Sequence, residues 1–232
     1  MTFVSVITST YNRFRFISRL IEMYKSQTYP HDQMEWIILD DGDEKTGALF
    51  AAANIVNIRY ISLDTKLPMG AKLNRLKQEA RGDITVVMDD DDYYPPTRVE
   101  TAVKALTKNP SHQVAGASKV YLYYTDTDEI YCAGPYHDKH ALNCTMAWRA
   151  AYALDHSYDD KEPCAVESAF LDNFTSPMVQ LKSRATILHI IHSSNSFNAI
   201  KARNMGQLGF KTALKLTDFM SAADAAKFVY AY

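Results

Sequence analysis

Apolar runs alternate with helical patterns through the first 110 residues. Four apolar runs predict strands, at residues 3–7, 35–39, 58–63 and 84–88. Between and after them, apolar side chains recur at helical spacing: Ile17, Leu20, Ile21 and Tyr24; Leu73, Leu76 and Ala80; and Val99, Ala102, Val103 and Leu106. Strands separated by amphipathic helices are typical of a doubly wound α/β fold with a mainly parallel sheet.

The second half of the chain has a different pattern. A long alternation of apolar and small polar residues at 114–124 predicts a strand that pairs with 130–132 through a turn at 126–129. Further strands are predicted at 145–148, 179–181 and 186–191, a short helix at 165–174, and one or two helices after residue 207. Since no internal repeat or linker interrupts the chain, we expect one unit of two fused lobes.

Polar clusters follow three of the predicted strands, at residues 8–13, 40–43 and 89–92. Ligands of such sheets bind beyond the carboxyl ends of the strands, so we expect a binding site there. The four consecutive carboxylates at 89–92 repel one another, and a hard divalent cation, Mg²⁺ or Mn²⁺, would relieve the repulsion. We extend this expectation to the acids at 40–43. The alternative is a solvated acidic turn before Pro95, but the position after a buried strand favours a cation.

The 8–13 cluster offers backbone donors, hydroxyls, an aromatic ring and a cation at the start of a helix. Helix N-termini favour anions, so a phosphate or nucleotide suits this place. The cluster lacks the glycine-rich fingerprint of dinucleotide folds and P-loops. A simple helix N-cap at Asn12 is an equal alternative.

Composition narrows the class of protein further. Lys and Arg number 25 against 27 Asp and Glu, and 47% of residues are hydrophobic, which predicts an ordinary globular protein that does not bind nucleic acid. The three cysteines form no zinc-binding pattern and favour a reducing compartment. We expect neither a signal peptide nor a membrane span, and we interpret the sequons at Asn143 and Asn173 as chance. The sequence indicates no oligomeric state.

Several blocks of the chain resemble the family 2 glycosyltransferases of the GT-A fold. They lie at residues 4–13, 26–29, 39–42, 70–74, 81–83 and 88–92. Residues 192–195, His-Ser-Ser-Asn after a late strand, resemble the small glycosyltransferases of large DNA viruses. The resemblance covers residues 3 to about 200. It implies a single GT-A domain over 1–232, with a mainly parallel central sheet flanked by helices and a smaller mixed sheet on the acceptor side.

By that resemblance, residues 1 to about 110 bind a nucleotide sugar and a metal ion, 111 to about 205 form the acceptor-side half, and 206–232 are C-terminal helices. The implied enzyme is an inverting, hexosyltransferase-type glycosyltransferase. It uses Mn²⁺ or Mg²⁺ to move a sugar from a nucleotide sugar, usually a UDP-sugar, to a hydroxyl of a glycan or glycoprotein. Its implied location is cytoplasmic, in the host cytoplasm for a viral enzyme.

The resemblance also implies roles for individual residues. The implied nucleotide-sugar set is Thr8, Ser9, Thr10, Tyr11, Arg13, Asp41, Lys72, Asn74, Asp89 and Asp90. Within it, Ser9, Tyr11 and Asp41 would surround the uracil, and Lys72 and Asn74 would lie near the diphosphate or ribose. Asp90 would face the ribose or the metal, and Asp91 would be the principal metal ligand. Four consecutive acids allow more than one register, so the places of Asp89 and Asp92 stay open. His192 would close the metal site, with His189 as the runner-up.

Family members place an acid pair on the acceptor side, and residues 166–171 occupy that place here. Val166 replaces the first acid, so Glu167 is the predicted catalytic base; the alternative is a carboxylate on a helix surface. The fallback bases are Asp159, Asp160 and Glu162. We expect residues 152–163 to form a loop over the donor. The candidates for the acceptor wall are Trp148, Tyr136 and His137, but for Trp148 core packing is the favoured interpretation.

Two other functions compete with the transferase. The first is a metal-dependent nucleotide-sugar hydrolase or phosphatase. Phosphatases with paired aspartates place a nucleophilic acid after the first strand, where this chain has Thr8 and Ser9. The second is a non-catalytic carbohydrate-binding module on the same fold, which would be expected to have lost metal or base residues. Asp91, His192 and Glu167 are all present.

Overall fold

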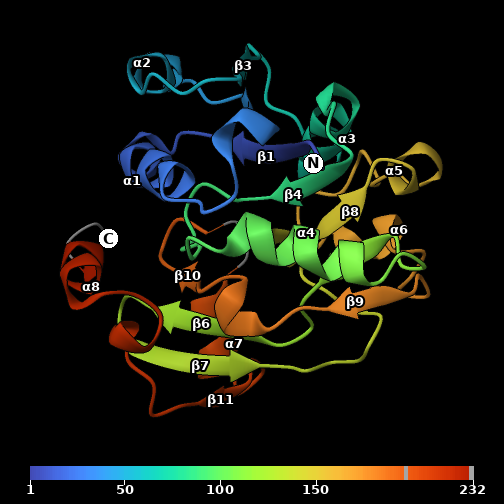
Figure 1. Ribbon diagram of the computed structural model, residues 1–232. Coiled ribbons are helices and arrows are strands. Elements are labelled where there is room, and N and C mark those ends of the chain that lie inside the picture. Colours follow the sequence, from blue (N-terminus) through green and yellow to red (C-terminus); the bar gives the residue numbers. More distant parts are fainter. Residues whose placement is uncertain (196–197, 230–232) are drawn as a thin grey trace.

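Two β-sheets form the framework of the computed structural model, which describes residues 1–195 and 198–229 (Figure 1). Among these residues, the central sheet has seven strands in the order β3-β2-β1-β4-β8-β5-β9, and the second has four in the order β10-β6-β7-β11. The central strands are β1 (Val4–Thr10), β2 (Met34–Asp40), β3 (Ile58–Ser62), β4 (Ile84–Val87), β5 (Val114–Gly116), β8 (Ala147–Arg149) and β9 (Met178–Gln180). The second sheet comprises β6 (Val120–Tyr124), β7 (Glu129–Ala133), β10 (His189–Ile191) and β11 (Phe210–Lys211).

The central sheet confirms the expected mainly parallel arrangement. Strands β1, β2, β3 and β4 all run parallel, while β8 runs antiparallel to both β4 and β5. Strands β1, β2 and β4 are buried along their whole length, as their continuous apolar character predicts. The sheet contains strands from both sides of residue 110.

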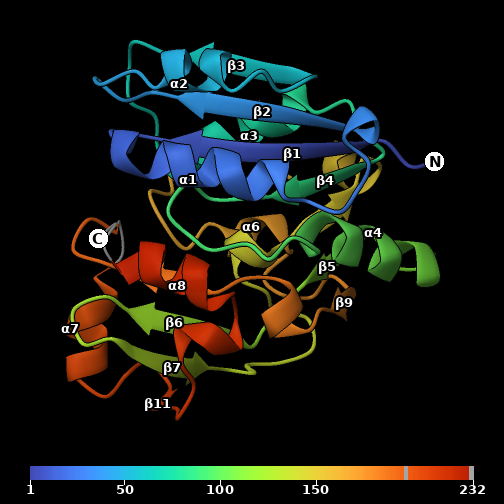
Figure 2. The same cartoon turned by 60° about the vertical axis from the view of Figure 1, so that its left-hand side comes forward.

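Helices cover both faces of the central sheet (Figures 1 and 2). They are α1 (Phe14–Lys25), α2 (Gly47–Ala52), α3 (Met69–Glu79), α4 (Arg98–Lys108), α5 (Tyr152–Asp155) and α6 (Glu167–Phe170). The apolar stripes of α1 and α4 belong to one core cluster, and that of α3 packs in a second cluster with α5 and α6. Each fully buried side chain of such a stripe contributes about 1.5–3 kcal/mol, so the stripes fix which face each helix covers.

The second sheet lies beside the first and carries the C-terminal elements (Figure 2). Strands β6 and β7 form the predicted antiparallel hairpin, β10 pairs parallel with β6, and β11 pairs with β7. Two further helices, α7 (Ala199–Asn204) and α8 (Ala222–Val229), follow β10 in the chain. Phe228 of α8 packs with Ile190 and Ile130 in a third apolar cluster.

Three predicted elements differ from the structure. The run 114–124 is not one strand, because it divides into β5 and β6 of different sheets. The chain turns between them where the amides of Ala117 and Ser118 donate to the side chains of Thr145 and Gln180. The helix at 165–174 is only the single turn α6, since residues 172–174 adopt left-handed backbone angles. The strand at 186–191 is reduced to β10, and α2 and α7 were not predicted.

The ends of β1, β2 and β4 meet at one edge of the central sheet, because the three strands are parallel neighbours. The polar clusters that follow these strands are therefore brought together, as predicted. Within residues 1–195 and 198–229, no helix combines the length and apolar character needed to cross a membrane.

Candidate active site

One cavity of about 1060 Å³ collects most of the predicted site residues. Its walls come from the end of β1, the segment leading into α3, the aspartate run after β4, the segments 136–144 and 161–167, and β10 with the start of α7. The predicted residues on its walls are Ser9, Thr10, Tyr11, Arg13, Lys72, Asp89, Asp90, Asp91, Tyr136, Glu167 and His189. The cavity therefore lies at the carboxyl edge of the sheet, where ligands of this fold class bind.

One end of the cavity combines an aromatic ring with two ammonium groups. The Nζ atoms of Lys66 and Lys72 lie 4.0 Å and 5.4 Å from the centre of the Tyr11 ring. Lys72 also pairs with Asp41 at 2.5 Å, and the other oxygen of Asp41 accepts the amide of Leu67 at 2.7 Å. The Asp41 side chain is fully buried, so it holds Lys72 from behind and does not line the cavity. Two lysines beside an aromatic ring suit a phosphorylated aromatic ligand.

The turn between β1 and α1 is built differently from the N-cap alternative. Asn12 has a left-handed backbone (φ 54°), and its Oδ1 accepts the amides of Asp43 and Glu44 at 2.8 Å and 3.1 Å. Arg13 occupies the N-cap position, without a side-chain capping bond. The N-cap interpretation of Asn12 is therefore wrong, because this side chain ties the ends of β1 and β2 together.

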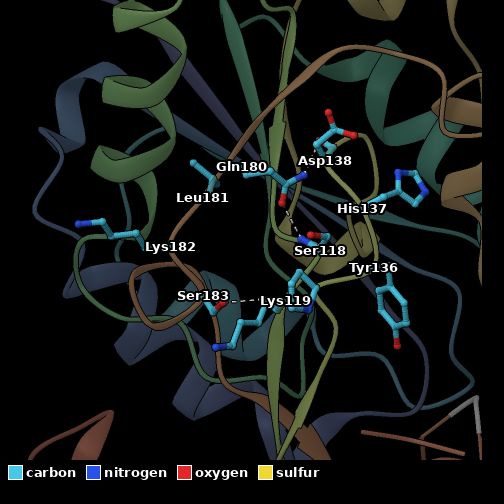
Figure 3. A pocket seen from close by; sticks show the side chains of 10 residues that line it. Ser118, Lys119, Tyr136, His137, Asp138, Gln180, Leu181, Lys182 and Ser183 are labelled. Carbon is cyan, nitrogen blue, oxygen red and sulfur yellow. Dashed lines mark hydrogen bonds between the residues drawn. The ribbon is translucent and has the colours of Figure 1, made fainter.

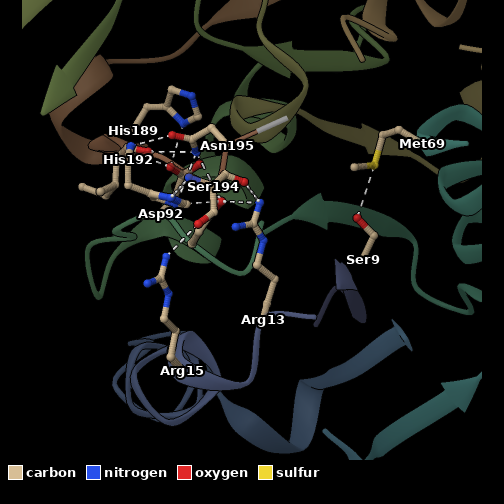
Figure 4. Close-up of polar contacts among 11 residues, drawn as sticks. Ser9, Arg13, Arg15, Met69, Asp92, His189, His192, Ser194 and Asn195 are labelled. Atoms are coloured by element: carbon tan, nitrogen blue, oxygen red, sulfur yellow. Dashed lines mark hydrogen bonds and ion pairs between the residues drawn. The ribbon is translucent and has the colours of Figure 1, made fainter. Parts of the chain in front are cut away.

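Asp91 is surrounded by donors from two distant segments, and Figure 4 labels these donors, Arg13, His192 and Asn195. Its Oδ2 lies 3.2 Å from Nε2 of His192, 3.3 Å from Nδ2 of Asn195 and 3.5 Å from Nη2 of Arg13. Arg13 also donates to the main-chain oxygen of Ser194 at 2.6 Å. The two residues predicted to hold the metal, Asp91 and His192, thus lie in contact, although His192 itself is buried behind the cavity wall.

The pKa values of the neighbouring carboxyl groups shift in different directions. Burial raises the pKa of Asp89 to about 8, and Asp92 and Asp91 add to the rise. Burial and the Asp91 charge also raise the pKa of Asp90 well above its usual value. For Asp91, burial acts in the same direction, but the His192 hydrogen bond and the Arg13 charge together bring its pKa below the ordinary value. Among the described residues, Asp89 and Asp90 thus have too little positive charge nearby to offset burial and the repulsion of neighbouring carboxylates.

The residues present fit a hard divalent cation. Oδ2 of Asp90 is buried and accepts no hydrogen bond from the described residues. Carboxylate oxygens of this kind are the ligands that Mg²⁺ and Mn²⁺ prefer. Asp90 and Asp91, which both line the cavity, are the residues that would hold such an ion.

Asp92 has a separate environment. It is fully buried, and its Oδ1 lies 2.7 Å from Nδ1 of His189 and accepts the amide of Ile190 at 2.8 Å (Figure 4). Burial alone would lower the pKa of His189, but Asp92 raises it to about 9. Ligand atoms of Asp92, His189 and Cys144 all lie within 4.8 Å of one another. Asp92 therefore joins the end of β4 to β10 of the second sheet.

Glu167 is the first residue of α6 and lines the same cavity as the aspartates. Burial raises the pKa of its carboxyl group. The fallback bases Asp159, Asp160 and Glu162 do not line the cavity. Asp160 instead accepts Nδ2 of Asn74 at 2.7 Å. Of these four acids, Glu167 is therefore the one that lines the cavity.

The loop at 152–163 begins with α5 and is fastened to α3. Asn74 donates to the main-chain oxygen of Tyr158 at 2.8 Å and accepts its amide at 2.9 Å. Gly70 donates to the oxygen of Glu162 at 3.0 Å, and a Cβ at position 70 would lie 1.8 Å from the oxygen of Asp159. The expected role of Asn74 beside the diphosphate or ribose is therefore corrected, because this side chain holds the loop and does not line the cavity.

Three further expectations are corrected. Thr8 lies in the core, where its hydroxyl donates to the oxygen of Met88 and accepts Nε1 of Trp36. Trp148 is fully buried against Phe170 and cannot form an acceptor wall. The acids at 40–43 hold the protein's own groups: Asp40 accepts Thr46, Tyr60 and Gly42, Asp41 pairs with Lys72, and Asp43 contacts Asn12.

Figure 3 shows the residues that line a second pocket. The volume of this pocket is about 530 Å³. Tyr136, whose side chain is 53% exposed, lines both pockets. His137 lines only the second one. Of the expected acceptor wall, Tyr136 is thus the member that reaches the main cavity.

Several cavity residues were missed by sequence reasoning. Those with polar side chains are Lys66, His140, Asn143, Cys144, Lys161, Cys164 and Asn195. Asn195 belongs to the tetrapeptide 192–195, on which the viral resemblance rests, so that motif could have indicated Asn195 as a site residue. The others lie in segments without periodicity, and only the packing of loops from both halves brings them to one wall.

Comparisons with known proteins identify the family of this chain. The family described as "Glycosyl transferase family 2" matches residues 5–143. This match covers more than half of the chain, and the chain belongs to glycosyltransferase family 2.

Two curated relatives each match a little under half of the chain. The uncharacterized glycosyltransferase YwdF of Bacillus subtilis (strain 168) is 31% identical over 104 residues, which is 44% of this chain and 38% of YwdF. The poly(ribitol-phosphate) beta-N-acetylglucosaminyltransferase TarS of Staphylococcus aureus (strain Mu50 / ATCC 700699) is 26% identical over 110 residues, 46% of this chain and 19% of TarS. The chain therefore corresponds to less than half of either relative.

Solved structures are similar to this chain over most of its length. Residues 1–349 of S. aureus TarS in complex with UDP-GlcNAc superpose with a TM-score of 0.69 at 18% identity, covering 83% of this chain and 60% of that one. The mannosyltransferase PcManGT of Pyrobaculum calidifontis, in complex with GDP-Man and Mn²⁺, gives a TM-score of 0.66 at 14% identity, covering 99% and 70%. At these identities the likeness shows the fold, which is that of GT-A glycosyltransferases.

Proposed function

We propose that the chain is a metal-dependent, inverting glycosyltransferase of hexosyltransferase type. It moves a sugar from a UDP-sugar to a hydroxyl group of a glycan or glycoprotein. The observation that carries the proposal is that Asp90, Asp91 and Glu167 line one cavity together with Tyr11 and Lys72. The complexes of TarS with UDP and UDP-GlcNAc support a nucleotide sugar as donor.

The proposed cofactor is Mn²⁺ or Mg²⁺, held by Asp90 and Asp91. When bound, such an ion stabilises the negative charge that develops on the departing diphosphate. The Mn²⁺ in the PcManGT complex and the buried, unpartnered oxygen of Asp90 support this assignment. His192 holds the Asp91 carboxylate through its Nε2 contact of 3.2 Å.

Residues of this chain supply the rest of the proposed reaction. Lys66, Lys72 and Arg13 offer positive charge to the diphosphate, and Tyr11 offers a ring face to the base. Glu167 accepts the proton of the acceptor hydroxyl as the oxygen attacks the anomeric carbon. Attack from the face opposite the diphosphate inverts that carbon in a single displacement. A base with a raised pKa suits proton abstraction near neutral pH.

The finer assignments follow from the same proposal. We assign one GT-A domain to the chain, with its nucleotide half up to about residue 110 and its acceptor side from there to about residue 205. Three cysteines without disulfides support a cytoplasmic location. The relatives named above come from Bacillus, Staphylococcus and Pyrobaculum, so the viral resemblance rests on residues 192–195 alone.

The test is to incubate the chain with UDP-glucose, UDP-galactose, UDP-GlcNAc and GDP-mannose, with Mn²⁺ or with EDTA, and to follow nucleotide release. We expect Mn²⁺-dependent release that rises when acceptor glycans are added, and a product of inverted anomeric configuration by NMR. Release that yields free sugar and ignores every acceptor would instead identify a hydrolase. Absence of turnover with every donor contradicts the transferase.

A further inference from the structure

Asp92, His189 and Cys144 form a cluster that the proposed transfer reaction does not use. The three residues come from different parts of the fold: Asp92 follows β4, Cys144 lies in the 3₁₀ turn at Asn143–Thr145, and His189 begins β10. One ligand atom from each lies within 4.8 Å of the other two. Cys144 and His189 also line the main cavity, so an ion can reach them from solvent.

Only one oxygen of the Asp92 carboxylate has hydrogen-bond partners among the described residues. Its Oδ1 is engaged by His189 and by the amide of Ile190. Its Oδ2 is buried and accepts no hydrogen bond from the described residues. A buried carboxylate oxygen without a donor is costly, so this atom indicates that the cluster can take a further positive ligand.

This cluster is separate from the carboxylates assigned to Mn²⁺ or Mg²⁺. Asp91 contacts His192, Asn195 and Arg13. Asp92 instead contacts His189 at the start of β10 (Figure 4). The chemistry differs as well, since thiolate and imidazole are poor ligands for hard cations. One sulfur, one nitrogen and one oxygen ligand are instead a set that Zn²⁺ accepts, with an open fourth position for water.

We propose that Asp92, Cys144 and His189 form a second metal site that binds Zn²⁺ in the wall of the main cavity. On binding, the thiol of Cys144 releases its proton to water and the thiolate becomes a ligand. The bound ion links the loop after β4 to β10 and so joins the two sheets. The site binds the ion without any sugar donor or acceptor.

Titration of the tag-free full chain tests the site directly, with excess Mg²⁺ present to occupy the hard-ligand carboxylates. Zn²⁺ affinity is measured by competition with a chromophoric chelator, and Co²⁺ serves as a spectroscopic probe of sulfur ligation. We expect one Co²⁺ per chain with a sulfur-to-cobalt charge-transfer band. We also expect Zn²⁺ to raise the unfolding temperature, because it binds only the folded arrangement.

Variants identify the ligands. Cys144→Ser should abolish the charge-transfer band. Both Cys144→Ser and His189→Gln should weaken Zn²⁺ binding by at least about 100-fold, because each removes a direct ligand. Loss of a residue that only hydrogen-bonds to a ligand weakens binding by about 10–100-fold. Cys132→Ser is the matched control, because Cys132 is an equally buried thiol in β7. Unfolding temperatures without metal show whether each variant is folded.

A wild-type chain that gives no charge-transfer band, or a Cys144→Ser chain that keeps the band and the affinity, overturns the proposal. Loss of the band in Cys132→Ser overturns it as well. Because no donor or acceptor takes part, a failure here leaves the proposed transferase intact. Absence of glycosyl transfer would equally leave the zinc measurement interpretable.

Discussion

The guanidinium of Arg13 lies 3.5 Å from the Asp91 carboxylate, and the same nitrogen donates to the main-chain oxygen of Ser194 at 2.6 Å. One side chain at the start of α1 thus connects the aspartate run to the segment after β10. Both partners are largely buried, so solvent screens this contact less than an exposed ion pair. We infer that Arg13 sets the position of Asp91 for the binding of a metal–nucleotide complex.

Replacing Arg13 by Met should weaken binding of UDP with Mn²⁺ about tenfold, since a hydrogen bond to a charged group contributes roughly 1.5–3 kcal/mol. Calorimetric titration with UDP and Mn²⁺ measures the change. Arg15→Met is the matched control, because exposed Arg15 contacts the hydroxyl of Ser194 and does not line the cavity. If wild type and Arg13→Met bind UDP with equal affinity, the ion pair between Arg13 and Asp91 does not contribute to donor binding.

Replacing Asp91 by Ala should abolish the Mn²⁺ dependence of UDP binding. We expect at least about 100-fold weaker binding in the presence of Mn²⁺, because the change removes a direct ligand of the ion. Asp43→Ala provides the control: this acid lies at the neighbouring strand end, is exposed, and contacts Asn12 rather than the cavity. If Asp91→Ala binds UDP as tightly as the wild type and still responds to Mn²⁺, the metal assignment is wrong.

Replacing Glu167 by Gln should lower the rate of sugar transfer by about 10²–10⁴-fold, the usual contribution of a positioned base. UDP binding should not change. Burial raises the Glu167 pKa, and the unprotonated form is the base, so wild-type transfer should fall as the pH drops through that raised pKa. Glu162→Gln is the control, as Glu162 does not line the cavity.

Rates of transfer and donor affinities across pH test this assignment together. An unchanged rate in Glu167→Gln would place the base on another residue. A pH profile of wild type that lacks the acidic limb would contradict the role of the carboxylate even if the variant is slow.

Local patterns in the sequence were sufficient to predict the parallel strands whose ends form one side of the main cavity. The apolar runs of β1, β2 and β4 are continuous, and parallel neighbours end at one edge, so the placement of the aspartate run followed from pattern alone. Glu167, which the family resemblance singled out as the base, lines the cavity, although its helix α6 is only one turn long.

Contacts between distant segments could not be predicted in this way. Asp92 meets His189 across 97 positions, and no local property of either residue indicates the pairing. Between β5 and β6, the amides of Ala117 and Ser118 donate to the side chains of Thr145 and Gln180 instead of to a neighbouring strand, and the strand is interrupted there. Such contacts arise from the packing of the two sheets, which periodicity does not encode.

Asp40 should stabilise the fold through its hydrogen bonds. It accepts the hydroxyls of Thr46 and Tyr60, each at 2.6 Å, and the amide of Gly42 at 2.9 Å. Burial alone would raise its pKa, but these hydrogen bonds bring the pKa below the ordinary value. Asp40→Asn should therefore lower the free energy of unfolding by about 1.5–3 kcal/mol at neutral pH.

The sign of the pH dependence follows from the lowered pKa. The contribution of Asp40 is complete above the pKa of the unfolded chain, about 3.9, and is lost as the pH falls through the folded-state value. The difference between wild type and Asp40→Asn in urea unfolding should thus shrink in acid. Asp43→Asn should change stability by no more than about 0.5 kcal/mol, as is usual for exposed positions. Equal effects of both variants would contradict the role of the Asp40 network.

Trp148 and Tyr136, both expected at the acceptor wall, should respond to substitution in opposite ways. Trp148 is fully buried between Phe170 and Tyr158, so Trp148→Ala should lower the free energy of unfolding by about 3–5 kcal/mol. Tyr136 is 53% exposed between the two pockets, so Tyr136→Ala should change stability by less than about 0.5 kcal/mol and raise the acceptor KM while the donor KM stays constant. Urea unfolding and transfer kinetics measure the two effects. An unchanged acceptor KM in Tyr136→Ala would exclude this ring from the acceptor site, because a residue that packs on the acceptor must alter its binding when removed.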